Sequence, residues 1–171
     1  MTGAIFNVSA QGGPMRIGEV EGIAFPPIEA ETLSGEVFNA PDPEKKTAMV
    51  LFIAFRRKVQ EEIDAWFAAV GNEIRKTGSI QAYEVPMLSG GWKMMSGIID
   101  GGMRSGIPAD QHGNVATYYG RLSDYRELLH MKNPGSCYVF IVDKEGIIRF
   151  AASGAPKDEL ASGFIEVLGS L

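Results

Sequence analysis

Three consecutive basic residues stand between an unbroken apolar run at 48–55 and a segment with helical periodicity; they are Arg56, Arg57 and Lys58. The short apolar run is typical of a strand buried on both faces, so these three residues, here called the basic corner, mark a strand-to-helix corner. A helix N-terminus already carries partial positive charge, so cations there favour an anion or an acidic partner. The alternative is a solvated corner balanced by Glu61 and Glu62, one turn later.

The only cysteine of the chain is Cys137. It excludes an internal disulfide, CxxC chemistry and a thiolate-rich zinc site. Its position at the start of an apolar run favours a small buried core residue, with a reactive thiol as the alternative. Asp110 and His112 are too few to form a metal site, and His130 has no sequence-neighbouring partner. We expect no metal and no cofactor.

The elements that position these residues follow from periodicity. A helix is predicted over 58–76 from a stripe of apolar residues: Val59, Ile63, Trp66, Phe67, Val70 and Ile74. Gly78 should end this helix. Strands are predicted at 80–85, ended by Pro86, and at 114–119. Two further strands, 137–142 and 147–151, flank a glycine-containing turn and form an antiparallel hairpin at the edge of the sheet.

Helices are predicted in three further places. One is centred on 93–103 in a glycine-rich region, with Trp92, Met95, Ile98, Ile99 and Met103 on its apolar face. A short helix at 124–131 has Ser123 as its N-cap. Pro156 suits the first turn of the last helix, whose buried stripe ends the chain: Leu160, Phe164, Leu168 and Leu171.

Length and charge bound the class of protein. The chain has 171 residues, 45% of them apolar, and a net charge of −5, which together indicate one soluble domain and disfavour a nucleic-acid binder. Residues 1–24 read as an irregular lead-in with short strands near Ile5–Val8 and Met15–Val20. No stretch is long enough for a membrane helix, and no signal peptide is recognisable. We expect a cytoplasmic protein, or a mitochondrial one whose targeting segment has been removed.

Three passages resemble the thioredoxin-like redoxin domains: the lead-in Phe25–Gly35, the core strand Thr47–Phe55 and the hairpin Tyr138–Arg149. The resemblance implies a single domain over 25–171, a three-layer α/β/α fold with a mixed central sheet and an insertion at about 87–113. Redoxin enzymes place a cysteine at the first turn of the helix after the core strand. The basic corner stands there instead, so the resemblance implies a fold without its redox residues.

A narrower resemblance covers Asp100–Pro108 and Tyr138–Gly154, which are similar to the mitochondrial ATP synthase assembly factor 10 family. Those thioredoxin-like proteins assist the assembly of a membrane subunit. The resemblance therefore implies a protein partner, for which a membrane-protein subunit is one candidate. The resemblance points to a second functional segment, comprising Met103, Arg104, Gly106, Ile107 and Pro108; with Ser105, part of it could also bind an anion.

We therefore expect a non-catalytic binding or assembly protein, chaperone-like in function, whose surface joins the basic corner to Met103–Pro108. Two alternatives stay open. One is a single-cysteine thiol peroxidase or oxidoreductase that uses Cys137. The other is a protein that binds a small anion or a nucleotide at the basic corner.

Overall fold

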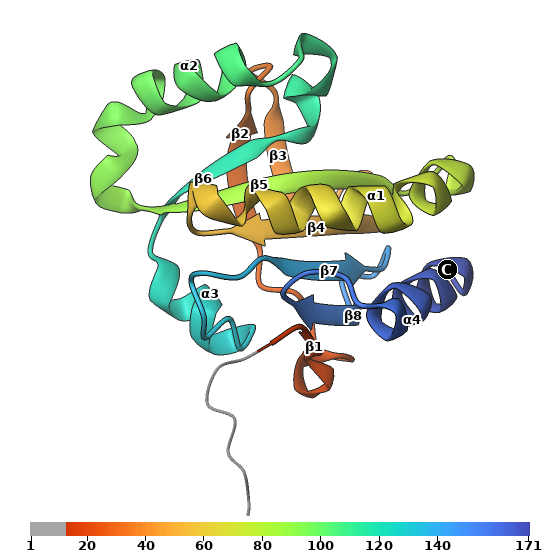
Figure 1. Ribbon diagram of the computed structural model, residues 1–171. Coiled ribbons are helices and arrows are strands. Elements are labelled where there is room, and N and C mark those ends of the chain that lie inside the picture. The colour runs from red at the N-terminus through yellow and green to blue at the C-terminus, as the bar shows by residue number, and fades with distance from the viewer. Residues whose placement is uncertain (1–12) are drawn as a thin grey trace, which may run out of the picture.

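A mixed eight-stranded sheet forms the centre of the molecule (Figure 1). The computed structural model describes residues 13–171. The strands follow the spatial order β1-β8-β7-β4-β5-β6-β2-β3. Their bounds are β1 Met15–Arg16, β2 Ile28–Thr32, β3 Val37–Ala40, β4 Met49–Ala54, β5 Gln81–Ser89, β6 Ala116–Gly120, β7 Tyr138–Val142 and β8 Ile148–Ser153.

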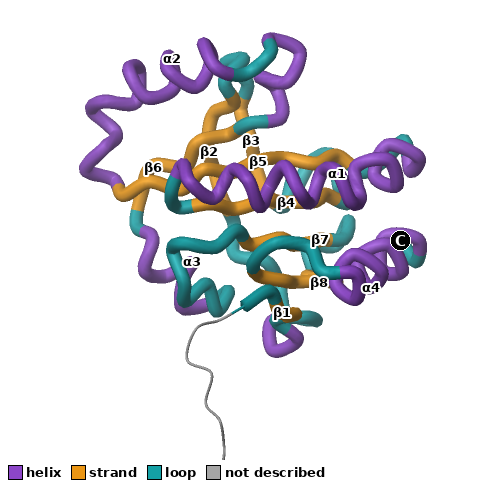
Figure 2. Tube along the Cα trace, viewed as in Figure 1, coloured by secondary structure: helices purple, strands orange, loops and turns teal. Residues whose placement is uncertain are grey.

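Helices lie on both faces of this sheet (Figure 2). The α-helices are α1 Gln60–Thr77, α2 Ser96–Gly106, α3 Leu122–Leu128 and α4 Asp158–Gly169. Short 3-10 turns precede or connect them: η1 Gly18–Val20, η2 Arg57–Val59, η3 Gly90–Met95 and η4 Ala109–Asn114. The predicted strand of Ile5–Val8 lies outside the described residues, and only Met15–Arg16 of the predicted Met15–Val20 strand is extended.

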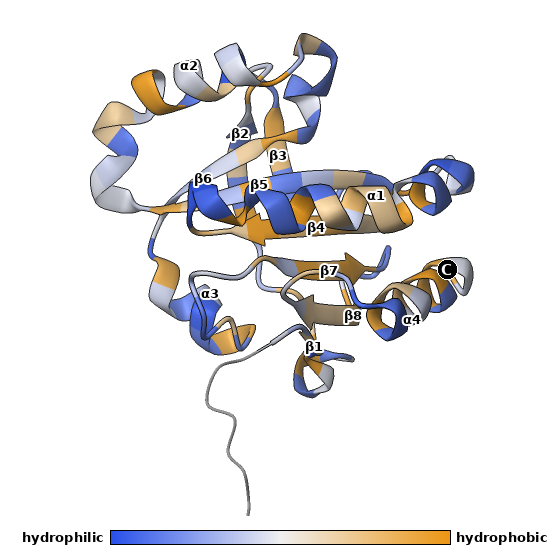
Figure 3. Cartoon of the chain, viewed as in Figure 1, coloured by the Kyte–Doolittle hydropathy of each residue, from blue (hydrophilic) through white to orange (hydrophobic). Residues whose placement is uncertain are grey.

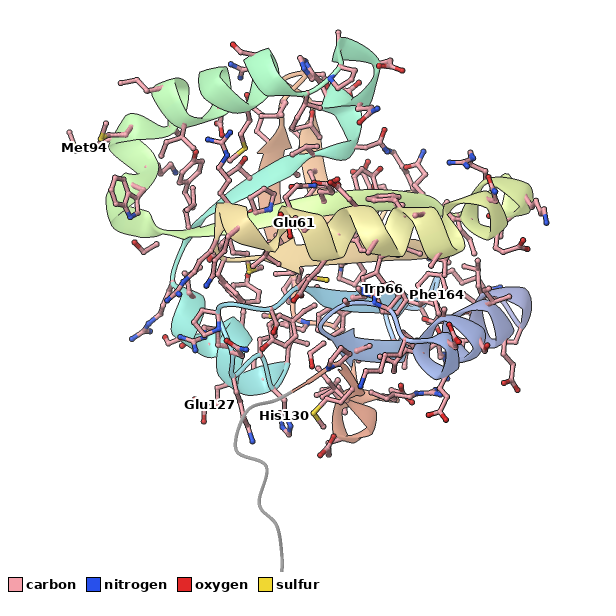
Figure 4. The ribbon with its side chains drawn as sticks, viewed as in Figure 1. Glu61, Trp66, Met94, Glu127, His130 and Phe164 are labelled. Carbon is pink, nitrogen blue, oxygen red and sulfur yellow. The ribbon has the colours of Figure 1, made fainter. Side chains whose placement is uncertain are left out.

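The apolar core strand is buried on both faces, as its composition predicts. Along β4, Met49, Leu51 and Ile53 join one core cluster, while Val50 and Phe52 join the other. The second cluster is covered by α1 and α4, where Trp66 packs against Phe150 and Phe164 (Figure 4). The hydropathy colouring shows the same pattern, with apolar strands inside and mixed helices outside (Figure 3).

The predicted helix after the core strand is confirmed, with a short 3-10 turn at its start. Its apolar stripe faces the sheet, and Ile63, Trp66 and Val70 are buried. Gly78 ends α1 in the left-handed conformation, with φ of 65°, as the glycine stop predicts. The β7–β8 hairpin is also confirmed, and its register joins Tyr138 to Ser153.

The hairpin does not form the edge of the sheet, which corrects the prediction. β7 pairs with β4, and β1 covers the outer side of β8 through Met15 and Arg16. Residues of the lead-in therefore take the outermost place. The two edge strands of the sheet are β1 and β3.

Three predicted boundaries differ in the structure. β5 continues through Pro86 to Ser89, because Pro86 lies where β5 leaves β4 and begins to pair with β6. α3 begins at Leu122, so Ser123 is not its N-cap, and the Ser123 hydroxyl donates to the Asp124 carboxylate instead of capping a backbone N–H. Pro156 likewise precedes α4, which starts at Asp158.

The glycine-rich insert forms the crossover between the parallel strands β5 and β6. Its α-helix starts at Ser96, later than predicted, because the chain first winds through the 3-10 turn η3 from Gly90. Neither η3 nor α2 contains a buried residue, so the predicted apolar face is largely left in solvent.

Candidate binding site

The basic corner lies at the carboxyl ends of the parallel strands. After Ala54 the chain stays extended at Arg56 (φ −145°, ψ 141°) and then turns into η2. Val59 anchors this turn in the core, with 1% of its surface exposed. Because β4 and β6 both run parallel to β5, Arg121, which follows β6, reaches the same end of the sheet.

All three side chains of the basic corner are exposed. Within residues 13–171, none of them takes part in an ion pair. The Glu62 carboxylate does not balance them by contact, because its Oε2 accepts the backbone N–H of Cys137 at 2.7 Å. Glu62 therefore joins α1 to the start of β7.

A further basic side chain, Arg126, comes from a distant part of the chain and lies beside the corner. The Arg126 guanidinium lies over the ring of Phe55, 5.8 Å from its centroid. It also donates from Nε to the Met131 carbonyl at 3.2 Å and from Nη2 to the Lys132 carbonyl at 2.9 Å. Arg126 is thus held in place as part of the same basic surface.

The loop before β7 forms the other wall of the corner. Lys58 Cε and Nζ both lie 3.9 Å from the position that a Cβ on Gly135 would occupy. The loop is braced by Asn133, whose Oδ1 accepts the N–H of Gly135 at 2.9 Å and whose carbonyl accepts the Tyr138 hydroxyl at 3.0 Å. The corner and this loop form one continuous surface.

The single thiol lies behind this surface, not on it. Cys137 is fully buried, and its Sγ is 4.0 Å from the Gly154 carbonyl oxygen. Burial raises the pKa of the Cys137 thiol well above its usual range, and the neighbouring Glu62 and Glu84 carboxylates raise it further. These conditions disfavour a thiolate nucleophile.

The second predicted segment ties the insert to the sheet. Arg104 Nε donates to the Leu33 carbonyl at 2.8 Å, and Thr117 Oγ1 lies 3.7 Å from Met103 Sδ. Ser105 bonds within its own helix, to the Gly101 carbonyl at 3.0 Å. Gly106 ends α2, and Pro108 precedes η4.

The structure does not bring the two predicted segments together. Leu33, to which Arg104 is bonded, pairs with Val115 at the beginning of β6, whereas the basic corner lies where the parallel strands end. The insert, from η3 through α2 to η4, leads from the end of β5 back to the beginning of β6 (Figure 1). The corner and Met103–Pro108 are therefore separate candidate surfaces.

Sequence reasoning missed the basic residues that follow β6, namely Arg121, Arg126 and Lys132. One signal was available. The ends of parallel strands meet at one edge, so basic residues after the predicted strand 114–119 belong beside those after the core strand. The contact of Arg126 with Phe55 depends on the conformation of the 129–133 chain and has no sequence signal.

Other kinds of site are not evident in the part of the chain that the structure describes. Residues 13–171 contain no group of three or more His, Cys, Asp or Glu that could hold a metal ion. None of the helices described is long and apolar enough to cross a membrane. A hollow of about 540 Å³ lies at the opposite end of the sheet, lined by Lys46, Ser79, Asp143, Arg149 and Leu171 among others. The basic corner, whose three side chains are exposed, is an open surface.

This fold and site define a thioredoxin-like α/β protein without the redox cysteines. A candidate protein disulfide isomerase from Bacteroides thetaiotaomicron is similar, with a TM-score of 0.61, 11% identity and 93% of each chain covered. The pneumococcal exposed lipoprotein thioredoxin Etrx1 from Streptococcus pneumoniae has a TM-score of 0.56 and 13% identity, with 85% of this chain and 100% of that chain covered. Likeness at such identities shows the fold alone.

The family follows from the sequence itself. The family model described as ATP10 protein matches residues 19–171, and the chain belongs to this family. Both resemblances expected from the sequence are thereby confirmed. No curated protein matches the chain.

Proposed function

We propose that this chain is a non-catalytic binding protein that assists the assembly of another protein and holds that partner at the basic corner. Membership of the ATP10 protein family and the thioredoxin-like fold support a general assembly or chaperone-like role. A membrane-protein subunit is the partner that the family resemblance implies.

One observation carries the assignment to the corner. At the position where the redoxin resemblance places a catalytic cysteine, this chain exposes Arg56, Arg57 and Lys58, none of them ion-paired within residues 13–171. Arginine side chains form bidentate hydrogen bonds with carboxylates, so an acidic segment of a partner suits this surface. The whole chain has a net charge of −5, which makes the concentration of cations at this corner distinctive.

Co-purification from the native host tests the proposal. Arg56→Glu/Arg57→Glu should lose the partners that the wild type retains, because the two changes replace attraction by like-charge repulsion. The matched control is Arg75→Glu/Lys144→Glu, which makes the same change in net charge at exposed positions at the opposite end of the sheet. Unchanged partners in the corner variant would contradict the assignment.

Binding of a small phosphate-bearing ligand at the same corner is the second candidate, favoured by its three exposed cations, none of them ion-paired within residues 13–171. The same two variants distinguish it from protein binding. A rise in melting temperature with pyrophosphate or ATP that disappears only in the corner variant would assign the site to a small anion. Equal responses in wild type and corner variant would exclude it.

A further inference from the structure

The corner between η3 and α2 exposes large apolar side chains to solvent. Exposed fractions are 52% for Trp92, 98% for Met94, 45% for Met95 and 72% for Ile98; these four residues are called the apolar tip. Trp92 and Met95 are three residues apart, as are Met95 and Ile98, and Met94 and Ile98 are four apart, so each of these pairs lies side by side on the helical surface. Figure 4 shows Met94 pointing away from the body of the molecule.

None of these side chains belongs to either core cluster of residues 13–171. η3 and α2 contain no buried residue, although helices normally gain their stability by burying an apolar face. Four glycines of α2 have no atom within 4 Å of the position of a Cβ, namely Gly97, Gly101, Gly102 and Gly106. These four positions of α2 therefore border open space.

Cations frame the apolar tip. Lys93 is exposed within it, and a Cβ on Gly90 would lie 3.6 Å from the Gly120 Cα, so Arg121, the next residue, lies close to η3. Between residues 89 and 108 the single acidic residue is Asp100, whose carboxylate accepts the Tyr119 hydroxyl at 2.9 Å. Figure 1 shows η3 and the start of α1, with its basic corner, at the same end of the sheet.

We infer that the apolar tip docks onto an anionic lipid surface, with Trp92, Met94 and Ile98 in the interface and the surrounding cations at the headgroups. Protruding apolar residues framed by Lys and Arg are the pattern of peripheral membrane binding. Exposed apolar side chains with cations beside them suit an anionic lipid surface better than a protein interface, whose apolar centre is normally surrounded by a polar rim. The inference goes beyond the proposed function, which concerns a protein partner at the basic corner.

Vesicle binding of the full chain tests the inference. Sedimentation with vesicles of phosphatidylcholine plus phosphatidylglycerol should retain the protein, and vesicles of phosphatidylcholine alone should retain much less. Met94→Ser/Ile98→Ser should weaken binding about tenfold or more, because both side chains lose their place in the interface. The matched control is Leu128→Ser/Ile165→Ser, which removes two exposed apolar side chains elsewhere and should bind like the wild type.

Tryptophan fluorescence gives an independent readout. Trp66 is fully buried, so a blue shift of emission on adding anionic vesicles reports Trp92. Lys93→Glu should reduce this shift while leaving the folded protein's emission without vesicles unchanged.

Absence of vesicle binding would overturn the inference. So would equal binding by the wild type and Met94→Ser/Ile98→Ser. A third outcome would also overturn the inference: the wild type binds no vesicles, and Met94→Ser/Ile98→Ser loses protein partners that the wild type retains. The apolar tip would then belong to a protein interface. Failure here leaves the corner assignment intact, because that assignment depends on the Arg56→Glu/Arg57→Glu variant.

Discussion

Cys137 lies in surroundings that disfavour thiol chemistry. Its backbone N–H is held by Glu62 Oε2 at 2.7 Å, and its sulfur is enclosed between β7 and the end of β8 near Gly154. A carboxylate beside a buried thiol disfavours the thiolate twice, by repulsion and by the absence of solvent. A peroxidase would need the opposite environment.

We therefore expect Cys137 to resist alkylation in the native protein. Because burial raises the pKa of the thiol, its reaction with iodoacetamide at neutral pH should be at least about 100-fold slower than that of the denatured chain. Mass spectrometry of native and denatured samples measures both rates. Rapid native labelling, or peroxide consumption that disappears in Cys137→Ser, would restore the thiol-enzyme alternative.

Single elements could be predicted where local pattern and tertiary role agree. β4 and α1 were predictable, because a short apolar run followed by helical periodicity is compatible with few structures other than a buried strand leading into a helix. The turn at Gly146 was predictable as well. The path of β5 through Pro86 could not be predicted, since it depends on where one pairing partner replaces another. The start of α3 was missed because Ser123 bonds to a side chain instead of the backbone.

The β7–β8 hairpin depends on one buried carboxylate. Asp143 is 4% exposed; its Oδ1 accepts the N–H groups of Glu145 at 3.0 Å and Ile147 at 2.8 Å, and its Oδ2 accepts from Arg149 Nε. Burial raises the pKa of Asp143, but the hydrogen bonds from Ile147 and Arg149 outweigh it and hold the pKa below the ordinary 3.8.

Asp143→Asn should therefore lower the free energy of unfolding by about 1–3 kcal/mol at neutral pH. A lowered folded-state pKa contributes stability above the unfolded pKa of about 3.8, and this contribution is lost as pH falls through the folded value. Urea unfolding at several pH values measures it: the wild-type and variant curves should converge in acid. Asp110→Asn, at an exposed position, is the control. A difference that does not shrink as the pH falls below 3.8 would contradict the explanation.

At the scale of the whole molecule, the candidate site combines segments that are far apart in the sequence. The basic corner was predictable from Arg56–Lys58 alone, whereas Arg126 and the Gly135 loop join it only through the packing of α3 and β7. The predicted joining of the basic corner to Met103–Pro108 is wrong, because the insert carries Met103–Pro108 back toward the beginning of β6, away from the corner. The sequence indicates which side chains could bind a partner, but it does not indicate how far apart the basic corner and Met103–Pro108 lie in the fold.

The same architecture predicts unequal local stability. Amide hydrogens of α2 should exchange orders of magnitude faster than those of β4 and β7, because α2 has no buried residue and several glycines, while β7 is buried throughout. Arg104→Ala should speed exchange in α2 further by removing its bond to Leu33, with little change in global unfolding. Hydrogen-exchange mass spectrometry measures both effects. Equal protection of α2 and the central strands would contradict this prediction.

The two outermost strands of the sheet, β1 and β3, are both short. β1 comprises two residues and β3 four, so each end presents only a short row of backbone groups to another chain. Long exposed edges are templates for edge-to-edge growth into fibrils, and short ones are poor templates. Met15 and Arg16 protect the end of β8 from such growth, and Ile17, Gly22 and Ile23 cover the rest of its edge. A truncation that removed Met15 and Arg16 would therefore expose only Ala152 and Ser153.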